Sequence, residues 1–84
     1  MIHVLKILEQ FADAIVDGDK NFEIRNNDRG FQKGDDVRFI VVDINGKRQR
    51  GHAIELNTYR ITYVLSGWGL EPGYVVFGIR RVDT

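Results

Sequence analysis

Residues 18–25 read Gly-Asp-Lys-Asn-Phe-Glu-Ile-Arg, a G-x-K-x-x-E-x-R pattern that directly follows a short amphipathic segment. Glu23 and Arg25 are two positions apart, so on a strand they share a face. Lys20 follows a glycine, where the chain turns and its side chain can swing toward that face. Such a cluster can hold a planar polar ligand, because arginine forks onto a phosphate or carbonyl and glutamate accepts from an amine. Solvated ion pairs, worth only ~0.2–1 kcal/mol, are the alternative interpretation.

The segment before this motif is predicted to be a short helix. Apolar residues at positions 8, 11, 12, 15 and 16 follow the i, i+3, i+4, i+7, i+8 spacing of one helix face. Gly18 suits the position just after the helix, where a positive φ costs glycine little. A helix this short does not persist alone. We therefore expect it to pack on a sheet.

The rest of the chain is predicted to form mainly strands. We expect strands at residues 2–7, 20–25, 37–44, 59–66 and 74–82, with Ile61, Tyr63 and Leu65 on one face. Asn45-Gly46 is a strong hairpin signal, so a return strand is expected from Lys47, interrupted near Gly51. The predicted fold class is mainly β (α+β): a small β-barrel or strongly curved sheet with one short capping helix.

Size and composition limit the function. The 84 residues predict a single domain over residues 1–84, and the absence of cysteine excludes disulfides and thiolate metal sites. No segment approaches the roughly 20 apolar residues of a membrane helix, and the N-terminus lacks the features of a secretion signal, so a cytoplasmic protein is expected. Charge is balanced at 12 basic and 12 acidic residues. That balance disfavours a broad, sequence-blind nucleic-acid binder, although residues 47–60 are locally basic.

The motif and its flanks carry a family resemblance. G-x-K-x-x-E-x-R between a first helix and a second strand resembles the signature of the ASCH domain, a family of the PUA-like superfamily of small β-barrels associated with RNA. Residues 3–8, 25–29 and 61–65 follow the order of a short bacterial and phage branch of that family, as do Phe31, Gly34-Asp35 and residues 73–76. The resemblance covers nearly the whole chain and implies a PUA-like barrel.

The same resemblance implies a ligand site. In the family the motif residues line a cleft at one end of the barrel. Carried over, Lys20 and Arg25 would contact a phosphate or a base carbonyl, and Glu23 would orient them or accept from an exocyclic amine. Were the chain an enzyme, Lys20 and Glu23 would be its catalytic residues.

Three further residues are candidates for the ligand site. Lys6 shares a strand face with Ile2 and Val4, so it either extends to the rim or reaches the cleft beside Lys20. Arg29 follows a turn-forming run and belongs either to that turn or to the cleft edge. Trp68, flanked by glycines, can stack on a nucleobase or plug an open barrel end, and the plug is slightly favoured.

Mainly structural roles are predicted for the remaining aromatic residues and for the two histidines. Apolar patterns place four phenylalanines in the core: Phe11, Phe22, Phe39 and Phe77. His3 is expected to be a satisfied rim residue and His52 to be exposed. Neither histidine has neighbours at metal-ligand spacing, so we expect no metal and no cofactor.

Three functions remain open. The preferred hypothesis is a binding module for RNA or a nucleotide, with few phosphate contacts. The first alternative is a small hydrolase of RNA or a modified nucleoside. Some ASCH relatives hydrolyse an amide on modified cytidine with a threonine three residues after the motif lysine. Glu23 occupies that position here and is a poor substitute for a hydroxyl. The second alternative is a phage or host protein-interaction module with a protein partner.

Overall fold

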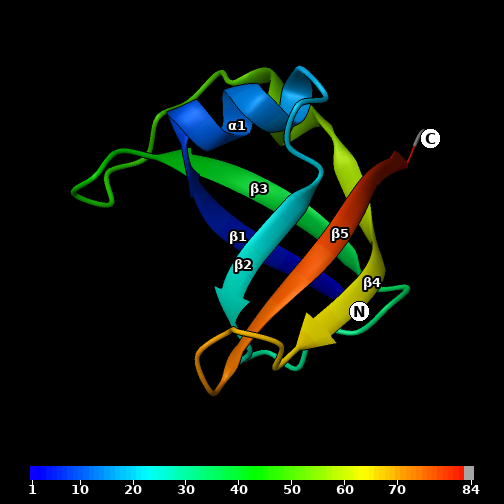
Figure 1. Cartoon of the computed structure of the whole chain (residues 1–84). Coiled ribbons are helices and arrows are strands. Elements are labelled where there is room, and N and C mark those ends of the chain that lie inside the picture. Colours follow the sequence, from blue (N-terminus) through cyan, green and yellow to red (C-terminus); the bar gives the residue numbers. More distant parts are fainter. Residues whose placement is uncertain (83–84) are drawn as a thin grey trace.

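A computed structural model of the chain describes residues 1–82 and is mainly β (Figure 1). Five strands form one curled sheet, a half-barrel in the order β1-β3-β4-β5-β2. A single short α-helix and one 3₁₀ segment complete the described part of the chain. In chain order the elements are β1 (Ile2–Leu8), α1 (Glu9–Val16), β2 (Phe22–Asn26), β3 (Asp36–Val42), η1 (Ala53–Leu56), β4 (Thr58–Ser66) and β5 (Tyr74–Val82).

The first and second strands become the two edges of this sheet. β1 pairs in parallel with β3, from Ile2 opposite Asp36 to Leu8 opposite Val42. The chain between these strands contains α1 and β2, and β2 pairs antiparallel with β5 at the far edge. The motif strand is therefore an edge strand, which leaves one row of its backbone groups without a strand partner. Within residues 1–82 no helix is long and apolar enough to cross a membrane.

The predicted helix is confirmed, and it packs over one end of the curled sheet (Figure 1). Ala12 and Ile15 are buried against the core, which the inner faces of the strands supply. Gly18 has φ +83°, and its backbone N–H donates to the carbonyl of Ile15 at 3.1 Å. A glycine just past the helix therefore ends it, as the sequence predicts.

Two of the four phenylalanines expected in the core are outside it. Phe39 and Phe77 are fully buried, but Phe11 and Phe22 are 41% and 40% exposed. Glu23 faces inward on β2, so strand alternation turns Phe22 outward. Phe11 lies on the part of α1 that is not covered by the sheet, and the broad apolar stripe of the helix did not distinguish it from Ala12.

The Asn45-Gly46 turn forms, but the strand expected after it does not. Gly46 has φ +83°, and Asp43 Oδ1 accepts hydrogen bonds from the backbone N–H groups of Asn45 and Lys47, each at 2.9 Å. Beyond the turn only Arg48 forms a bridge, to Val42. Glu55 of η1 takes over part of the missing pairing, because its Oε2 accepts from Val41 N–H at 2.9 Å.

The expected common face of Ile61, Tyr63 and Leu65 is also wrong. The register of β4 against β5 shifts between Ile61 and Tyr63, so Ile61 is buried while Tyr63 is exposed. A bulge of this kind adds one residue and reverses the alternation that follows it. Gly78 lies opposite this irregularity, and a Cβ there would come within 2.6 Å of Thr62 Oγ1. The close approach explains the glycine.

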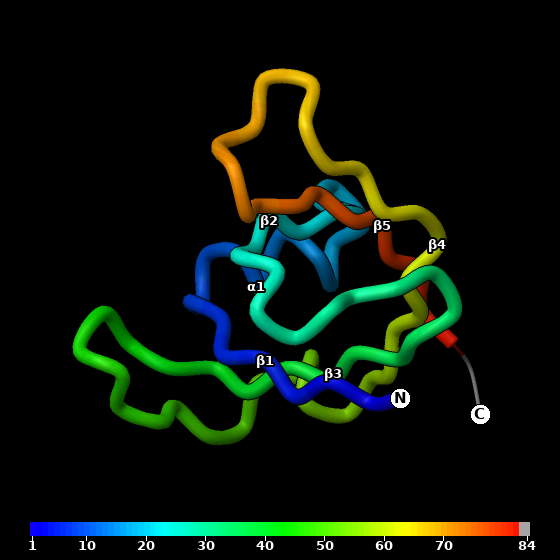
Figure 2. The backbone as a smooth tube through the Cα atoms, turned by 90° about the horizontal axis from the view of Figure 1, so that it is seen from below, coloured from blue at the N-terminus to red at the C-terminus, as the bar shows by residue number. Residues whose placement is uncertain are grey.

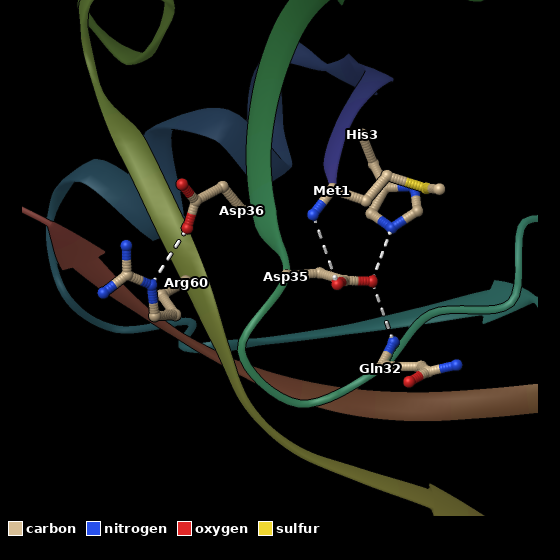
Figure 3. A network of polar contacts seen from close by, with 6 residues as sticks. All are labelled: Met1, His3, Gln32, Asp35, Asp36 and Arg60. Carbon is tan, nitrogen blue, oxygen red and sulfur yellow. Dashed lines mark hydrogen bonds and ion pairs between the residues drawn. The ribbon is translucent and has the colours of Figure 1, made fainter.

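A polar network anchors the start of β1 to the loop before β3 (Figure 3). His3, expected at the rim, is buried, and its Nε2 lies 2.8 Å from Asp35 Oδ2. The same oxygen accepts from the backbone N–H of Gln32, and the amino group of Met1 lies 3.7 Å from Oδ1. The hydrogen bond from His3 is the main cause that lowers the pKa of Asp35 below its ordinary value of 3.8.

Asp35→Asn is expected to lower the free energy of unfolding at neutral pH by about 1–2 kcal/mol, since it removes a partly buried charged acceptor. A lowered folded-state pKa means that this contribution is complete above pH 3.8 and is lost as the pH falls through the folded value. Urea unfolding measured from neutral pH down to acid pH checks this. The variant should lose less stability on acidification than the wild type.

Asp36→Asn is the matched control, because Asp36 is the next residue and its carboxylate, among residues 1–82, pairs with Arg60 Nε alone, at 2.9 Å (Figure 3). That pair is more exposed and contributes about 0–1 kcal/mol. Equal effects of the two substitutions at every pH would contradict the role assigned to Asp35.

Candidate functional site

Lys20, Glu23 and Arg25 meet at one place on the motif strand. Glu23 and Arg25 share the inner face of β2, as their spacing predicts, and Lys20 approaches from the preceding turn. Lys20 Nζ lies 3.3 Å from Glu23 Oε2, and Arg25 Nη2 lies 3.6 Å from Glu23 Oε1. These contacts place one carboxylate between two cations.

The carboxylate of Glu23 is buried but incompletely satisfied. The residue is 6% exposed, and its Oε1 is a buried atom that no described residue supplies with a hydrogen bond. Lys20 gives its shorter contact, at 2.8 Å, to the backbone carbonyl of Phe22. Burying a charged acceptor without donors is costly, and native proteins rarely leave such atoms unpaired. Glu23 therefore retains the capacity to accept a hydrogen bond from a ligand.

Arg25 and Arg29 join the two edges of the curled sheet. Arg25 Nη2 donates to the carbonyl of Lys6, and Arg29 Nη1 donates to the carbonyl of Val4, each at 2.8 Å. Both carbonyls belong to β1, the edge strand at the opposite end of the strand order. We call these two contacts the arginine closure. The sequence predicted a ligand contact for Arg25 and either a turn or a cleft-edge position for Arg29, and the structure shows a hydrogen bond from each to a backbone carbonyl of β1.

Lys6 is not brought into the cluster. Leu5 and Ile7 point into the core, so strand alternation leaves Lys6 exposed on the outer face with Val4 and Ile2. Within residues 1–82 its ammonium group forms no ion pair, and the part of Lys6 that lies at the motif is its backbone carbonyl. The expectation that its side chain reaches the cleft beside Lys20 is not met.

The Lys20–Glu23 pair borders a hollow with aromatic walls, which we call the aromatic hollow. It has a volume of about 400 Å³ and is lined by Phe11, Lys20, Phe22, Glu23 and Ile24. Lys20 Nζ lies 5.6 Å from the ring centroid of Phe11 and 5.1 Å from that of Phe22, within the range of cation–π attraction. The alternation of side chains along a strand could have predicted this hollow from the sequence. Because Glu23 faces inward, its neighbours Phe22 and Ile24 must face outward.

Trp68 does not plug the barrel, contrary to the slightly favoured expectation. It is 90% exposed in the loop between β4 and β5, which stands out from the rest of the chain (Figure 2). Its φ is +53°, and the flanking Gly67 and Gly69 also have positive φ. A bulky residue in this conformation is unusual and strained. The indole ring is exposed to solvent, and its alternative role of stacking on a base stays a prediction.

The histidines serve structural roles. His52, expected to be exposed, is only partly so: its Nε2 lies 2.6 Å from Asp13 Oδ1, and its Nδ1 accepts from the backbone N–H of Ile54 at 3.0 Å. His52 therefore caps η1 and ties it to α1. No three His, Cys, Asp or Glu residues among positions 1–82 are grouped closely enough to hold a metal ion.

Comparison with known proteins gives one family. A family model described as Domain of unknown function (DUF3850) matches residues 2–79. The matched range includes the motif, the arginine closure and all five strands except the last three residues of β5. A search among curated proteins found no match.

Proposed function

This chain belongs to the DUF3850 family, and we propose that it is an RNA- or nucleotide-binding module on a barrel of the ASCH, PUA-like type. The observation that carries the proposal is the buried Glu23 carboxylate, which has one oxygen without a hydrogen-bond donor and cations on both sides. The order of a first helix, the G-x-K-x-x-E-x-R motif and an edge strand supports the resemblance to ASCH domains.

A nucleobase with an exocyclic amine fits the chemistry of this site. The amine can donate to Glu23, and the exposed rings of Phe11 and Phe22 offer apolar faces for stacking. A half-turn about the terminal bond of a glutamate side chain only exchanges its two equivalent oxygens. An amine that enters the hollow would therefore compete with Lys20 for the oxygen that lies 3.3 Å from its Nζ.

The balanced charge of the chain favours a small footprint on nucleic acid. Contacts to two or three phosphates would give a slope of about −1 to −2 in a plot of log affinity against log salt concentration. A much steeper slope would indicate a broad basic surface, which a chain with 12 basic and 12 acidic residues does not supply.

An NMR titration of the wild-type protein with nucleotides and short single-stranded RNAs tests the proposal. We expect shifts at Phe11, Lys20, Phe22 and Glu23, and an affinity reduced about tenfold in Lys20→Ala, since a charge-assisted contact is lost. Lys47→Ala, in the exposed turn after β3, is the control with the same change of charge. Shifts confined to other surfaces would refute this site. Product analysis of the same samples tests the hydrolase alternative.

Trp68→Gly is expected to separate stability from binding. The left-handed backbone conformation of Trp68 costs a residue other than glycine about 1–2 kcal/mol, and glycine removes this cost. The free energy of unfolding of the variant should therefore be equal to that of the wild type or slightly higher. Affinity for single-stranded RNA should fall, because one base–aromatic stack is worth about 1–3 kcal/mol. Denaturation and RNA titration measure the two effects.

Trp68→Phe is the matched variant, since it keeps an aromatic face at the same strained position. It should retain most of the RNA affinity of the wild type. Undiminished RNA binding by Trp68→Gly would show that this indole contacts no base.

A further inference from the structure

The outer surface of β2, β5 and β4 is largely apolar. These strands are neighbours in the sheet, with β5 in the middle (Figure 1). Residues opposite one another in the register share a face, and every second residue of a strand returns to that face. Phe77 is buried in the core, so its neighbours Val76 and Gly78 lie on the outer side, together with the residues opposite them. We call six apolar side chains of this side the outer platform: Phe22, Ile24, Tyr63, Leu65, Tyr74 and Val76.

The outer platform is exposed and partly aromatic. Tyr63 is 64% exposed, Phe22 40% and Tyr74 38%. Phe22 and Tyr63 both lie opposite Gly78, one on each neighbouring strand, so two aromatic side chains flank a position of β5 that has no side chain. Contiguous apolar surface, unlike single exposed apolar residues, marks an interaction site.

A second hollow continues the outer platform toward the loop after β4. It has a volume of about 250 Å³. Ile24 and Tyr74 form its wall on the platform, and Gly69, Leu70 and Glu71 form its wall on the loop. Ile24 also lines the aromatic hollow. The two hollows therefore share Ile24, and a ligand can extend from one to the other along the outer side of β2.

Positive charge borders the outer platform. Among the outward positions of the three strands are two arginines, Arg60 and Arg80, and no acid. They lie directly opposite each other, next to the row of the sheet that contains Phe22. Arg60 is paired with Asp36 of β3, while Arg80 is exposed and forms no ion pair within residues 1–82. Lys20 adds a cation on the β2 side, with Nζ 5.1 Å from the centre of the Phe22 ring. A chain whose total charge is zero thus has an aromatic face with a positive border.

We propose that the outer platform binds single-stranded RNA by stacking, so that the ligand of the aromatic hollow is a strand of at least two nucleotides and not a free nucleotide. Exposed aromatic rings beside cations are the combination on which single strands bind, with the bases on the rings and the phosphates at the cations. This inference rests on the proposed function for its first base, at Glu23. A second copy of the chain suits this face less well, because it would bring the arginines of two copies together with no acid on the face to pair them.

Calorimetric titration with cytidine 5′-monophosphate and with a three-nucleotide oligocytidylate tests the inference. The wild type should bind the trinucleotide about tenfold or more tightly, since at least one further base stacks. Tyr63→Leu combined with Tyr74→Leu keeps apolar side chains but removes both rings. It should lose most of this preference and bind the monophosphate as the wild type does. Tyr63→Phe combined with Tyr74→Phe is the matched control, which keeps the rings and should keep the preference.

The salt dependence of binding tests the positive border. With an eight-nucleotide oligocytidylate, Arg80→Gln should reduce the slope of log affinity against log salt concentration by about 0.7, the contribution of one phosphate of a single strand. Arg50→Gln makes the same change at an exposed position in the basic segment after β3 and should keep the slope. An unchanged slope in Arg80→Gln, or an equal fall in both variants, would overturn the proposal.

The outcomes separate this inference from the proposed function. If the monophosphate and the trinucleotide bind the wild type equally, the outer platform holds no RNA, while the base site stands. If the trinucleotide binds and is weakened by the two leucine substitutions but not by Glu23→Leu, the platform stands and the base site is wrong. If neither probe binds, both are overturned. A wild-type dimer in sedimentation that Tyr63→Glu dissociates would also overturn the proposal, since a second copy would then cover the platform.

Discussion

Arg25→Ala combined with Arg29→Ala is expected to lower the free energy of unfolding by about 2–3 kcal/mol, with each exposed charged hydrogen bond contributing about 1 kcal/mol or slightly more. The two guanidinium groups hold the Lys6 and Val4 carbonyls of β1 and so join the two edges of the sheet. Domains are stable by only about 5–15 kcal/mol, so the loss is a large fraction of the total. Urea unfolding measures it.

Hydrogen exchange should show where the double variant loosens. Amides of β1 and β2 are expected to exchange faster relative to those of β4 and β5, which pair with each other along most of their length. The control is Lys33→Ala with Lys47→Ala, two exposed lysines whose removal changes the net charge equally. If this control and the arginine double variant unfold at the same urea concentration, the closure contributes nothing to stability.

The closure also limits how Arg25 can be used to test binding. Arg25→Ala removes a ligand candidate and a link between edges at once, so weaker binding by that variant has two explanations. Within residues 1–82 no hydrogen bond or ion pair joins Lys20 or Glu23 to β1, so these two residues give cleaner tests.

Glu23→Leu is expected to reduce nucleotide affinity about 10- to 100-fold, because a hydrogen bond to a charged acceptor is worth about 1.5–3 kcal/mol. Its effect on stability should be small. Replacing buried ionic groups by apolar side chains of similar volume is often neutral or stabilising, and here one carboxylate oxygen already lacks a donor. Lys20 and Arg25 retain their hydrogen bonds to backbone carbonyls. Nucleotide titration and urea unfolding of the same samples measure both quantities.

Glu23→Gln is the companion variant, since it keeps the shape and one acceptor oxygen but removes the charge. It should bind with an affinity between those of the wild type and Glu23→Leu. If Glu23→Leu binds like the wild type, the carboxylate has no role in recognition. If Glu23→Leu unfolds, the ion pairs with Lys20 and Arg25 are structural.

Local patterns were sufficient for the parts of the fold that depend on neighbours in sequence. The apolar spacing of residues 8–16 and the glycine at 18 predicted α1 and its end, and Asn45-Gly46 predicted the turn after β3. The failures arose where a distant element decides the outcome. Tyr63 turns outward because β4 bulges against Gly78 of β5, and Phe11 is exposed because the sheet covers only part of α1.

The sequence predicted that Lys20, Glu23 and Arg25 lie together, but not that Lys6 stays outside the cluster or that Phe11 and Phe22 line the hollow beside it. Trp68 was recognised as a loop residue, but that its side chain is exposed and does not plug the barrel came only from the structure.

The alternation of a strand, fixed by the geometry of the backbone, was enough by itself to put Glu23 and Arg25 on one face, and the turn after Gly18 allowed Lys20 to approach them. What Arg25 and Arg29 contact was decided by the tertiary structure alone. They reach β1 because the sheet curls until its two edge strands, β1 and β2, approach each other. That curl is the sum of twist and register over five strands, and no short stretch of sequence contains it.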